Sequence, residues 1–432
     1  MFSASFLVPV SIMSTASELH APIIDITVDK LGDINLWIRQ GKQYHNVPKY
    51  VSDKLCHRTS AMPAVTSLLP SPSLSVSLLL SFSTPPITKS LQGVDPEATF
   101  SFNNATHTSS ECLRLPSPSH AVLNALRAHA GQAMLDGKTS IQHWEHHSVF
   151  LPFDALGTWG LITEVNSAKK AWSDAMRWMD EERKNIPERY ISRVTTLLHT
   201  VSWKGHIKGL GSGLSITDMA TFLSEEWLSD THLDSMLAAA IRLRQDSLSC
   251  MVPHTEIVLS DFSSHILTSP LLVTSPITRS YLDKAPKSIL KLGSIISNAS
   301  MDIQIAAVSF SPPGHWASLL INFQAGTIGW GDSAGRPPPT GFEKRLKTWL
   351  AYFAPQNQFS GIHALPCAHQ SDGYSCGIIA VNTLKHHIFG DKFWNESLRE
   401  TLRISEFVDI LEFSESQTQV SFVSVLCIYD PY

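Results

Sequence analysis

Apolar residues recur at helical spacing in the second quarter of the chain. Over 121–134 they are Val122, Leu123, Leu126, Ala130 and Met134, and over 164–184 they are Val165, Ala168, Trp172, Met176 and Met179. Such a stripe, opposite a charged face like that at 180–184, is typical of an amphipathic helix that packs in a core or against another helix. We therefore predict a helical region of unknown role over residues 119–204.

The preceding part of the chain lacks a comparable pattern. Its most apolar run, 65–83, is rich in serine and is interrupted by Pro70 and Pro72. A membrane span needs ~20 predominantly apolar residues, and this run contains no unbroken stretch of that kind. We interpret the run as a linker and predict that residues 1–118 are largely disordered or irregular.

An alternating pattern appears after residue 300. It predicts strands over 301–310, 317–323 and 327–330, with a turn at 324–326. Thr340 and Glu343 then stand at capping-box spacing before a helix, whose apolar face is formed by Phe342, Leu346, Trp349, Leu350 and Phe353. A further strand is predicted over 361–365.

Two polar residues stand at the ends of this predicted hairpin. His315 precedes the second strand, and Asp332 follows the third. A hairpin brings its two ends side by side, so we expect these residues to be neighbours. A carboxylate that holds a histidine is the orienting half of a catalytic triad.

The segment 369–377 is a polar turn that contains Gly373, Cys376 and Gly377 and leads into the apolar run 378–384. A cysteine at the start of a helix lies where main-chain amides stabilise a thiolate, as a nucleophile requires. The alternative is a small buried cysteine that opens a core helix, which is the commoner role of a cysteine without partners. The partners therefore decide its role.

A glycine-rich segment at 205–213 marks a boundary between domains. It is not a phosphate loop, because no Lys-Ser/Thr pair follows it. The helix that comes next has Thr231 and Asp234 at capping-box spacing, and Trp227 and Asp230 lie just before it. Taken alone, these last two residues are a packing tryptophan and a helix cap.

Composition excludes several classes of protein. The net charge is -5 with both signs scattered, so we expect neither a nucleic-acid partner nor a membrane partner. Six scattered cysteines are too few for a disulfide framework and no positive region opens a signal peptide, so we expect a reducing compartment, the nucleus or the cytoplasm. His143 and His146 lack the HExxH pattern and a nearby cysteine, so no metal site is predicted there.

Together these motifs resemble one enzyme family. His315-Trp316, Asp332-Ser333, Gln370 six residues before Cys376, and the upstream segment 227–230 stand in the order found in the ubiquitin-like protein proteases, the SUMO-protease family of cysteine peptidases. The resemblance covers about 210–395. Ser229 stands where the family commonly has Asn, and 250–300 is difficult to align, so these differences bear on the identity of the modifier.

The resemblance implies an α+β, papain-like catalytic domain over 205–400, followed by a C-terminal tail over 401–432. It implies cleavage after the Gly-Gly tail of a small ubiquitin-like modifier, either in its precursor or in its conjugates, without a cofactor. The implied roles are nucleophile for Cys376, base for His315, orienting carboxylate for Asp332 and oxyanion donor for Gln370. Trp227 and Trp316 would enclose the tail, and Asp230 would contact the substrate.

Two alternatives belong to other classes. Residues 373–377 also fit the G-x-S-x-G elbow of serine hydrolases, with Ser375 as nucleophile, but that fold requires an acid and then a histidine later in the chain. The last histidines are His386 and His387, and no acid lies between Ser375 and them. The second alternative is a catalytically silent module that binds a ubiquitin-like modifier; the presence of all four catalytic residues argues against it.

Overall fold

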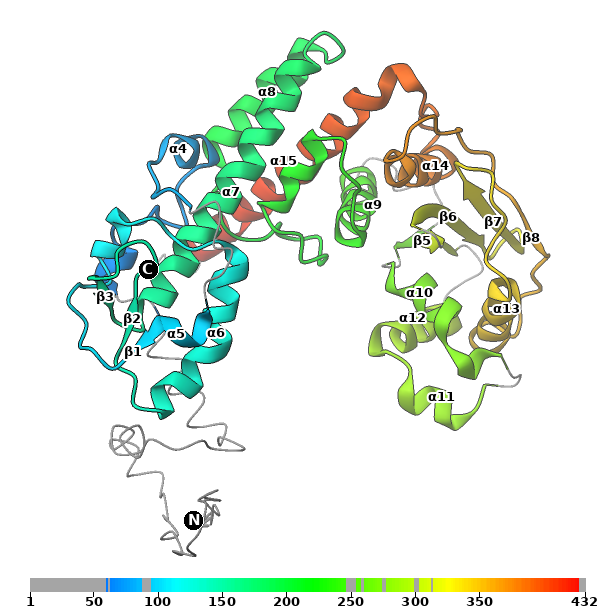
Figure 1. Cartoon of the computed structure of the whole chain (residues 1–432). Helices are drawn as coiled ribbons and strands as arrows, with labels where there is room; N and C mark the ends of the chain where they lie inside the picture. Colours follow the sequence, from blue (N-terminus) through cyan, green and yellow to red (C-terminus); the bar gives the residue numbers. More distant parts are fainter. Residues whose placement is uncertain are drawn as a thin grey trace, which may run out of the picture. The chain divides into compact units, whose positions relative to one another are not determined.

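The computed structural model describes residues 60, 63–87, 95–245, 254–257, 260–273, 277–298, 303–311 and 314–426. It divides into two compact units, coloured by sequence in Figure 1. The first unit comprises Met1–Ser71 and Ser81–Lys170, and the second comprises Pro72–Leu80 and Ala171–Tyr432.

The first unit is a small three-stranded antiparallel sheet with helices. Its elements are α3 (Pro63–Thr66), α5 (Pro96–Thr99), β1 (Phe100–Ser101), η2 (Glu111–Arg114), α6 (His120–Leu135), β2 (Ser140–Gln142), β3 (Phe150–Leu151) and the first part of α7 (Ala155–Glu181). The Ser119 side chain caps α6 by accepting a hydrogen bond from the Val122 N–H. Leu126, Ile141 and Trp159 are completely buried in its core.

Residues 63–87 and 95–118 are more ordered than their composition predicts. We predicted a linker over 65–83, yet α4 (Val76–Ser81) forms there and belongs largely to the second unit. Val76 and Leu79 are buried, and the Val76 N–H donates to the carbonyl of Val201. The linker prediction is wrong at this point because a short apolar helix docks on a distant segment. Residues 1–59, also predicted as irregular, lie outside the described residues.

The second unit holds a mixed sheet of five strands and most of the helices. In chain order these are α8 (Glu188–Thr200), η3 (Asp218–Leu223), α9 (Asp230–Gln245), β4 (His254–Ile257), α10 (Asp261–Thr268), η4 (Pro270–Leu272), α11 (Arg279–Lys284), α12 (Lys287–Asn298), β5 (Ile303–Ser311), β6 (His315–Asn322), β7 (Thr327–Asp332), α13 (Phe342–Phe353), β8 (Ile362–Ala364), α14 (Cys376–Phe389), η5 (Glu396–Leu398) and α15 (Arg399–Leu426).

The sheet has the order β4-β5-β6-β7-β8. Strands β5, β6 and β7 are antiparallel neighbours. The outer strands pair in parallel, β4 with β5 and β8 with β7. The predicted strands therefore agree with β5, β6 and β7 in position and order. Ala317 pairs with Asp332, so the start of β6 and the end of β7 share one edge of the sheet.

Helix α14 is buried along most of its length, as expected of a helix that other elements surround. Ile378, Ile379, Val381 and Leu384 are all buried. The Ser318 hydroxyl of β6 donates to the Ala380 carbonyl of α14, at 2.8 Å, which fixes the helix on the sheet. Helices α10, α12 and α13 contribute, together with the strands, to a core cluster that includes Phe262, Phe342 and Trp349.

The C-terminal helix corrects the predicted domain boundaries. We predicted a catalytic domain over 205–400 and a tail over 401–432. Instead Ile404, Phe407, Val408 and Leu411 of α15 are buried, and the Phe407 ring meets the ring of Trp172 from α7 at 6.2 Å. Their spacing is that of an amphipathic helix, so α15 is a core element. The second unit comprises Pro72–Leu80 and Ala171–Tyr432, so it extends beyond both ends of the predicted domain.

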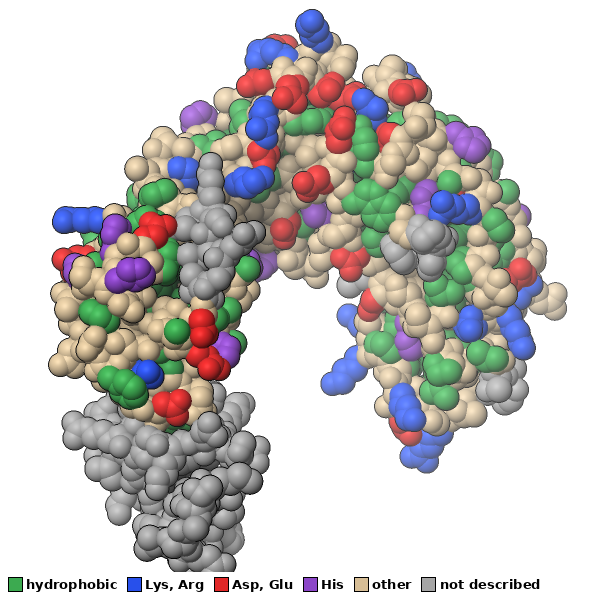
Figure 2. All heavy atoms as spheres, in the orientation of Figure 1, with side chains coloured by type: hydrophobic (Ala, Val, Ile, Leu, Met, Phe, Trp, Pro, Cys, Tyr) green, Lys and Arg blue, Asp and Glu red, His purple; other side chains and the backbone are tan. Residues whose placement is uncertain are grey.

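The surface and the helices add two observations. No helix within the described ranges has the length and apolar character required to cross a membrane. Figure 2 shows Lys and Arg side chains interspersed with Asp and Glu in the region of α8.

The packing of α15 predicts the result of truncation. A chain that ends at Glu400 would lose six buried apolar side chains, those of Ile404, Phe407, Val408, Ile410, Leu411 and Phe413. Each contributes about 1.5–3 kcal/mol by burial, against a typical total stability of about 5–15 kcal/mol. We expect this chain to lose cooperative thermal unfolding in circular dichroism, whereas a chain that ends at Leu426 retains it. An unchanged Tm for the chain ending at Glu400 would show that α15 is dispensable.

Candidate active site

His315 and Asp332 form a buried hydrogen-bonded pair. The Nε2 of His315, the first residue of β6, lies 2.9 Å from the Oδ1 of Asp332, the last residue of β7. The two side chains are 4% and 1% exposed. The Ala334 N–H also donates to Asp332 Oδ1, at 2.8 Å, which fixes the carboxylate. The register of the hairpin thus brings together the two residues that its sequence pattern predicted to be neighbours.

The electrostatics of this pair favour a charged imidazolium. The hydrogen bond to Asp332, followed by the interaction with Cys376, raises the pKa of His315 to about 9 although burial acts in the opposite direction. Burial acts to raise the pKa of Asp332, but the hydrogen bonds from His315 and the Ala334 N–H together hold it below its usual value. Because Nε2 faces Asp332, Nδ1 is the ring nitrogen left for the thiol.

Cys376 is the first residue of α14 and is 1% exposed. The next residue, Gly377, allows the helix start to pack closely: a Cβ there would lie 3.3 Å from a methyl carbon of Leu233 and 3.5 Å from Leu228. The main-chain amides of the first helical turn lack partners within the helix and favour negative charge. Cys376 therefore has both a histidine and a helix N-terminus to stabilise its thiolate.

The turn before Cys376 is held by Asp372. Its Oδ1 accepts hydrogen bonds from the N–H groups of Tyr374 and Ser375, and its Oδ2 accepts the Ser375 hydroxyl at 2.6 Å. Ser375 is completely buried. Its hydroxyl donates to Asp372 and holds the turn, whereas the serine-hydrolase alternative requires that hydroxyl as its nucleophile.

Gln370 lies between the turn that precedes Cys376 and the loop after β7. Its Oε1 accepts the Ser333 hydroxyl at 2.7 Å, and its Nε2 donates to the Asp372 carbonyl at 3.0 Å. A primary amide nitrogen carries two hydrogens, so the contact with Asp372 uses only one of them. The side chain is fixed by both ends of its amide.

Trp227 contacts both the residue before β6 and the turn that precedes Cys376. Its indole is 41% exposed, and Nε1 donates to the Gly373 carbonyl at 2.6 Å. The same ring lies against Gly314, where a Cβ would come within 3.0 Å of it. Trp227 therefore contacts the residue before His315 and the turn before Cys376.

Trp316, the second predicted wall of the tail passage, is buried beside the Trp227 segment. Its indole is 7% exposed, and Nε1 donates to the Leu228 carbonyl at 2.9 Å. The ring thus anchors the segment that carries Trp227.

Asp230 is the exposed first residue of α9, and its Oδ1 accepts the Thr231 N–H. The predicted capping box of Thr231 and Asp234 is wrong. Asp234 is buried and accepts hydrogen bonds from the N–H and hydroxyl of Ser260. The His232 ring instead reaches back to Ser229, whose N–H lies 3.2 Å from Nδ1, and this contact closes the helix start.

Sequence analysis missed Arg403 and Tyr374, which support these loops from behind. Arg403, on α15, is 1% exposed and donates to carbonyls of the segment before Trp227. The only signal in the sequence is an arginine next to the apolar face of a helix.

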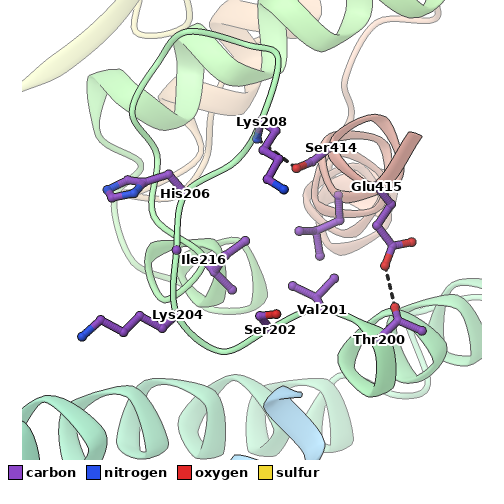
Figure 3. Close-up of a pocket in the computed structure, with 11 residues that line it drawn as sticks. Thr200, Val201, Ser202, Lys204, His206, Lys208, Ile216, Ser414 and Glu415 are labelled. Carbon is purple, nitrogen blue, oxygen red and sulfur yellow. Dashed lines mark hydrogen bonds between the residues drawn. The ribbon is translucent and has the colours of Figure 1, made fainter. Parts of the chain in front are cut away.

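Two other features lie outside this constellation. The His143 ring is buried, donates from Nε2 toward the Pro116 carbonyl, and accepts two main-chain N–H groups at Nδ1, which is a structural role. A hollow of about 470 Å³ lies between 200–216 and α15 (Figure 3), where Lys208 points inward and Glu415 accepts the Thr200 hydroxyl. None of the predicted site residues lines it.

Comparison with known proteins addresses the part of the chain that holds the triad residues. Residues 296–415 match the family model described as the Ulp1 protease family, C-terminal catalytic domain. That range includes His315, Asp332, Gln370 and Cys376, whereas Trp227 and Asp230 precede it. The search of curated proteins gave no match.

Several solved structures are similar to the chain. The C-terminal Ulp1 protease domain in complex with Smt3, the yeast ortholog of SUMO, is 18% identical, with coverage of 52% of this chain and 94% of that one and a TM-score of 0.39. The Ulp1-like SUMO protease catalytic domain of Chaetomium thermophilum is 16% identical, with coverage of 52% and 90% and a TM-score of 0.38. The Xanthomonas campestris effector XopD bound to ubiquitin is 18% identical, with coverage of 42% and 92% and a TM-score of 0.28.

At these identities and TM-scores the structural likenesses carry no functional argument, so the family match decides the assignment. The matched range begins before β5 and ends within α15, and it contains the whole His315–Asp332 hairpin and the helix that opens with Cys376. Residues 296–415 are therefore a catalytic domain of the Ulp1 protease family, and the chain carries a cysteine protease domain with an α+β fold.

Proposed function

We propose that this protein is a cysteine-type peptidase and isopeptidase that cleaves after the C-terminal Gly-Gly of a small ubiquitin-like modifier of the SUMO class. The observation that carries the proposal is the buried His315–Asp332 pair next to a cysteine at the start of α14. Its substrates would be the modifier's precursor and its conjugates. No cofactor takes part in the proposed reaction.

The reaction follows from the groups in the site. The Cys376 thiolate attacks the carbonyl carbon of the last glycine, and the negative charge moves to the carbonyl oxygen. The Cys376 N–H and the second amide hydrogen of Gln370 would donate to this oxyanion. His315 gives its proton to the departing amine as the C–N bond breaks, which leaves a thioester. Water then hydrolyses the thioester, and the thiol and histidine return to their initial state.

Trp227 supplies the proposed selectivity for glycine. Its ring spans Gly314 and Gly373, so an extended chain that approaches Cys376 would pass along an indole face. A side chain larger than hydrogen would collide with the ring. In the proposed complex, the partly exposed Asp230 end of α9 would contact the body of the modifier, and Trp316 would hold the Trp227 segment in place.

Replacing the nucleophile tests the proposal. We expect Cys376→Ala to abolish covalent labelling of the full chain by modifier probes with an electrophile at the terminal glycine. Ser375→Ala is the neighbouring control, which we expect to keep labelling with a modest loss of stability because its hydroxyl holds only the turn. Intact protein mass spectrometry measures both. Equal losses from the two changes would contradict the assignment, and a folded wild type that binds the modifier without labelling would favour the silent binding module.

The pH dependence of the reaction tests the role of Asp332. A raised pKa means that His315 keeps its proton up to about pH 9, so kcat/KM should fall on the alkaline side near that value. Asp332→Asn removes the largest cause of the shift, and the alkaline limb should move toward the ordinary histidine value of about 6.5. A profile of kcat/KM from pH 5 to about pH 10 measures this. An alkaline limb that stays in place in Asp332→Asn would contradict the role given to Asp332.

A further inference from the structure

Helix α15 places an arginine in the interior of the catalytic unit. Arg403 is 1% exposed, and its neighbour Ile404 and the nearby Phe407 are completely buried. A buried guanidinium is costly unless its N–H groups find acceptors. Burial lowers the pKa of Arg403 to about 10, so the group remains a cation at neutral pH.

The acceptors are main-chain carbonyls of the segment that leads to Trp227. Arg403 Nη2 donates to Thr221 at 2.8 Å and to Glu226 at 2.9 Å, and Nε donates to Phe222 at 3.2 Å. Thr221 and Phe222 stand at the C-terminal end of η3, where helical carbonyls lack partners within the helix and favour a cation. One side chain thus fixes both the end of η3 and the residue before Trp227.

The guanidinium also lies near the turn before Cys376. It lies 5.6 Å from the ring centre of Tyr374, which stands two residues before Cys376. The Tyr374 hydroxyl donates to Glu225 at 3.2 Å, so the ring also joins the turn to the segment before Trp227. The Trp227 indole closes the arrangement through its hydrogen bond to Gly373.

We infer that Arg403 is a positioning residue that sets the separation between Trp227 and Cys376, and so sets the width of the passage for the extended tail of the substrate. The inference rests on the proposed function. Arg403 itself touches neither the triad nor the substrate; it acts through 221–226 on one side and through Tyr374 on the other.

Arginine is required here for its shape as well as its charge. The planar fork reaches three carbonyls in fixed directions while its central carbon lies over an aromatic ring within cation–π range. A lysine keeps the charge but presents a compact ammonium on a flexible stem, and cannot satisfy the same set. Arg403→Lys therefore loosens the two segments without removing the cation.

The test compares Arg403→Lys with two matched variants of the full chain. Arg193→Lys makes the same change in an exposed arginine that pairs with Glu412 of α15. Phe407→Leu weakens the packing of α15 against Trp172 and serves as the variant of lowered stability. Tm values by circular dichroism place the variants on one scale of stability.

Two readouts follow, one with substrate and one without it. For Arg403→Lys we expect kcat/KM on a Gly-Gly substrate to fall about 10- to 100-fold, mainly in kcat, and the preference for Gly-Gly over Gly-Ala to shrink. We also expect faster amide hydrogen exchange in 221–227 and 372–376 than in either matched variant. Arg193→Lys should leave both readouts unchanged. Should Arg403→Lys fail to fold, Tyr374→Leu removes the aromatic ring next to the guanidinium and should speed exchange in 372–376.

The outcomes separate this inference from the proposed function. If no modifier is cleaved but Arg403→Lys speeds exchange in both segments, the positioning role stands and the proposed substrate is wrong. If wild type cleaves the modifier and Arg403→Lys matches Phe407→Leu at equal Tm in both readouts, Arg403 is only a core residue and the inference is overturned. Unchanged exchange in 221–227 and 372–376 would also overturn it.

Discussion

The hydrogen bond between His315 and Asp332 is the interaction on which the proposed chemistry depends. It lies in the interior at one edge of the sheet, where β6 starts and β7 ends. Because the carboxylate keeps its charge and the imidazole gains a proton, the pair presents a cation to Cys376. The antiparallel register of the hairpin is therefore a functional constraint: a slip of one residue would turn one of the two side chains to the other face of the sheet.

The thiol must be held as firmly as the histidine, and several distant segments share that task. The sheet holds α14 through Ser318, Leu228 and the α9 residue Leu233 pack on Gly377, and Asp372 holds the preceding turn. Behind them, α15 contributes Arg403. Cys376 and its helix are almost entirely covered, so access for a substrate depends on the loops that carry Trp227 and Gly373. The residues that hold these loops in place are therefore as important for the proposed reaction as the triad.

The sequence was informative where local pattern and site coincide. Alternation and turn residues predicted β5, β6 and β7, and the hairpin then placed His315 next to Asp332. It was less informative where long-range packing decides the structure. Helix α15 has a clear apolar face, but the predicted domain boundary at residue 400 lies soon after the helix that carries Cys376. The prediction therefore assigned α15 to a tail. Arg403 binds main-chain carbonyls, which leave no side-chain signature, and Asp234 fits a capping box locally yet bonds to Ser260.

The proposed chemistry requires that His315 be protonated at neutral pH, because it lies between Asp332 and Cys376. The most direct measurement is an NMR titration of the His315 ring in protein labelled with ¹⁵N-histidine, in wild type and in Cys376→Ala. We predict a midpoint near pH 9 for wild type and a lower one for Cys376→Ala, since the thiol is the second largest cause of the shift. A midpoint near the ordinary value of about 6.5 in wild type would mean that His315 is largely neutral at pH 7 and that Asp332 and Cys376 do not hold its proton.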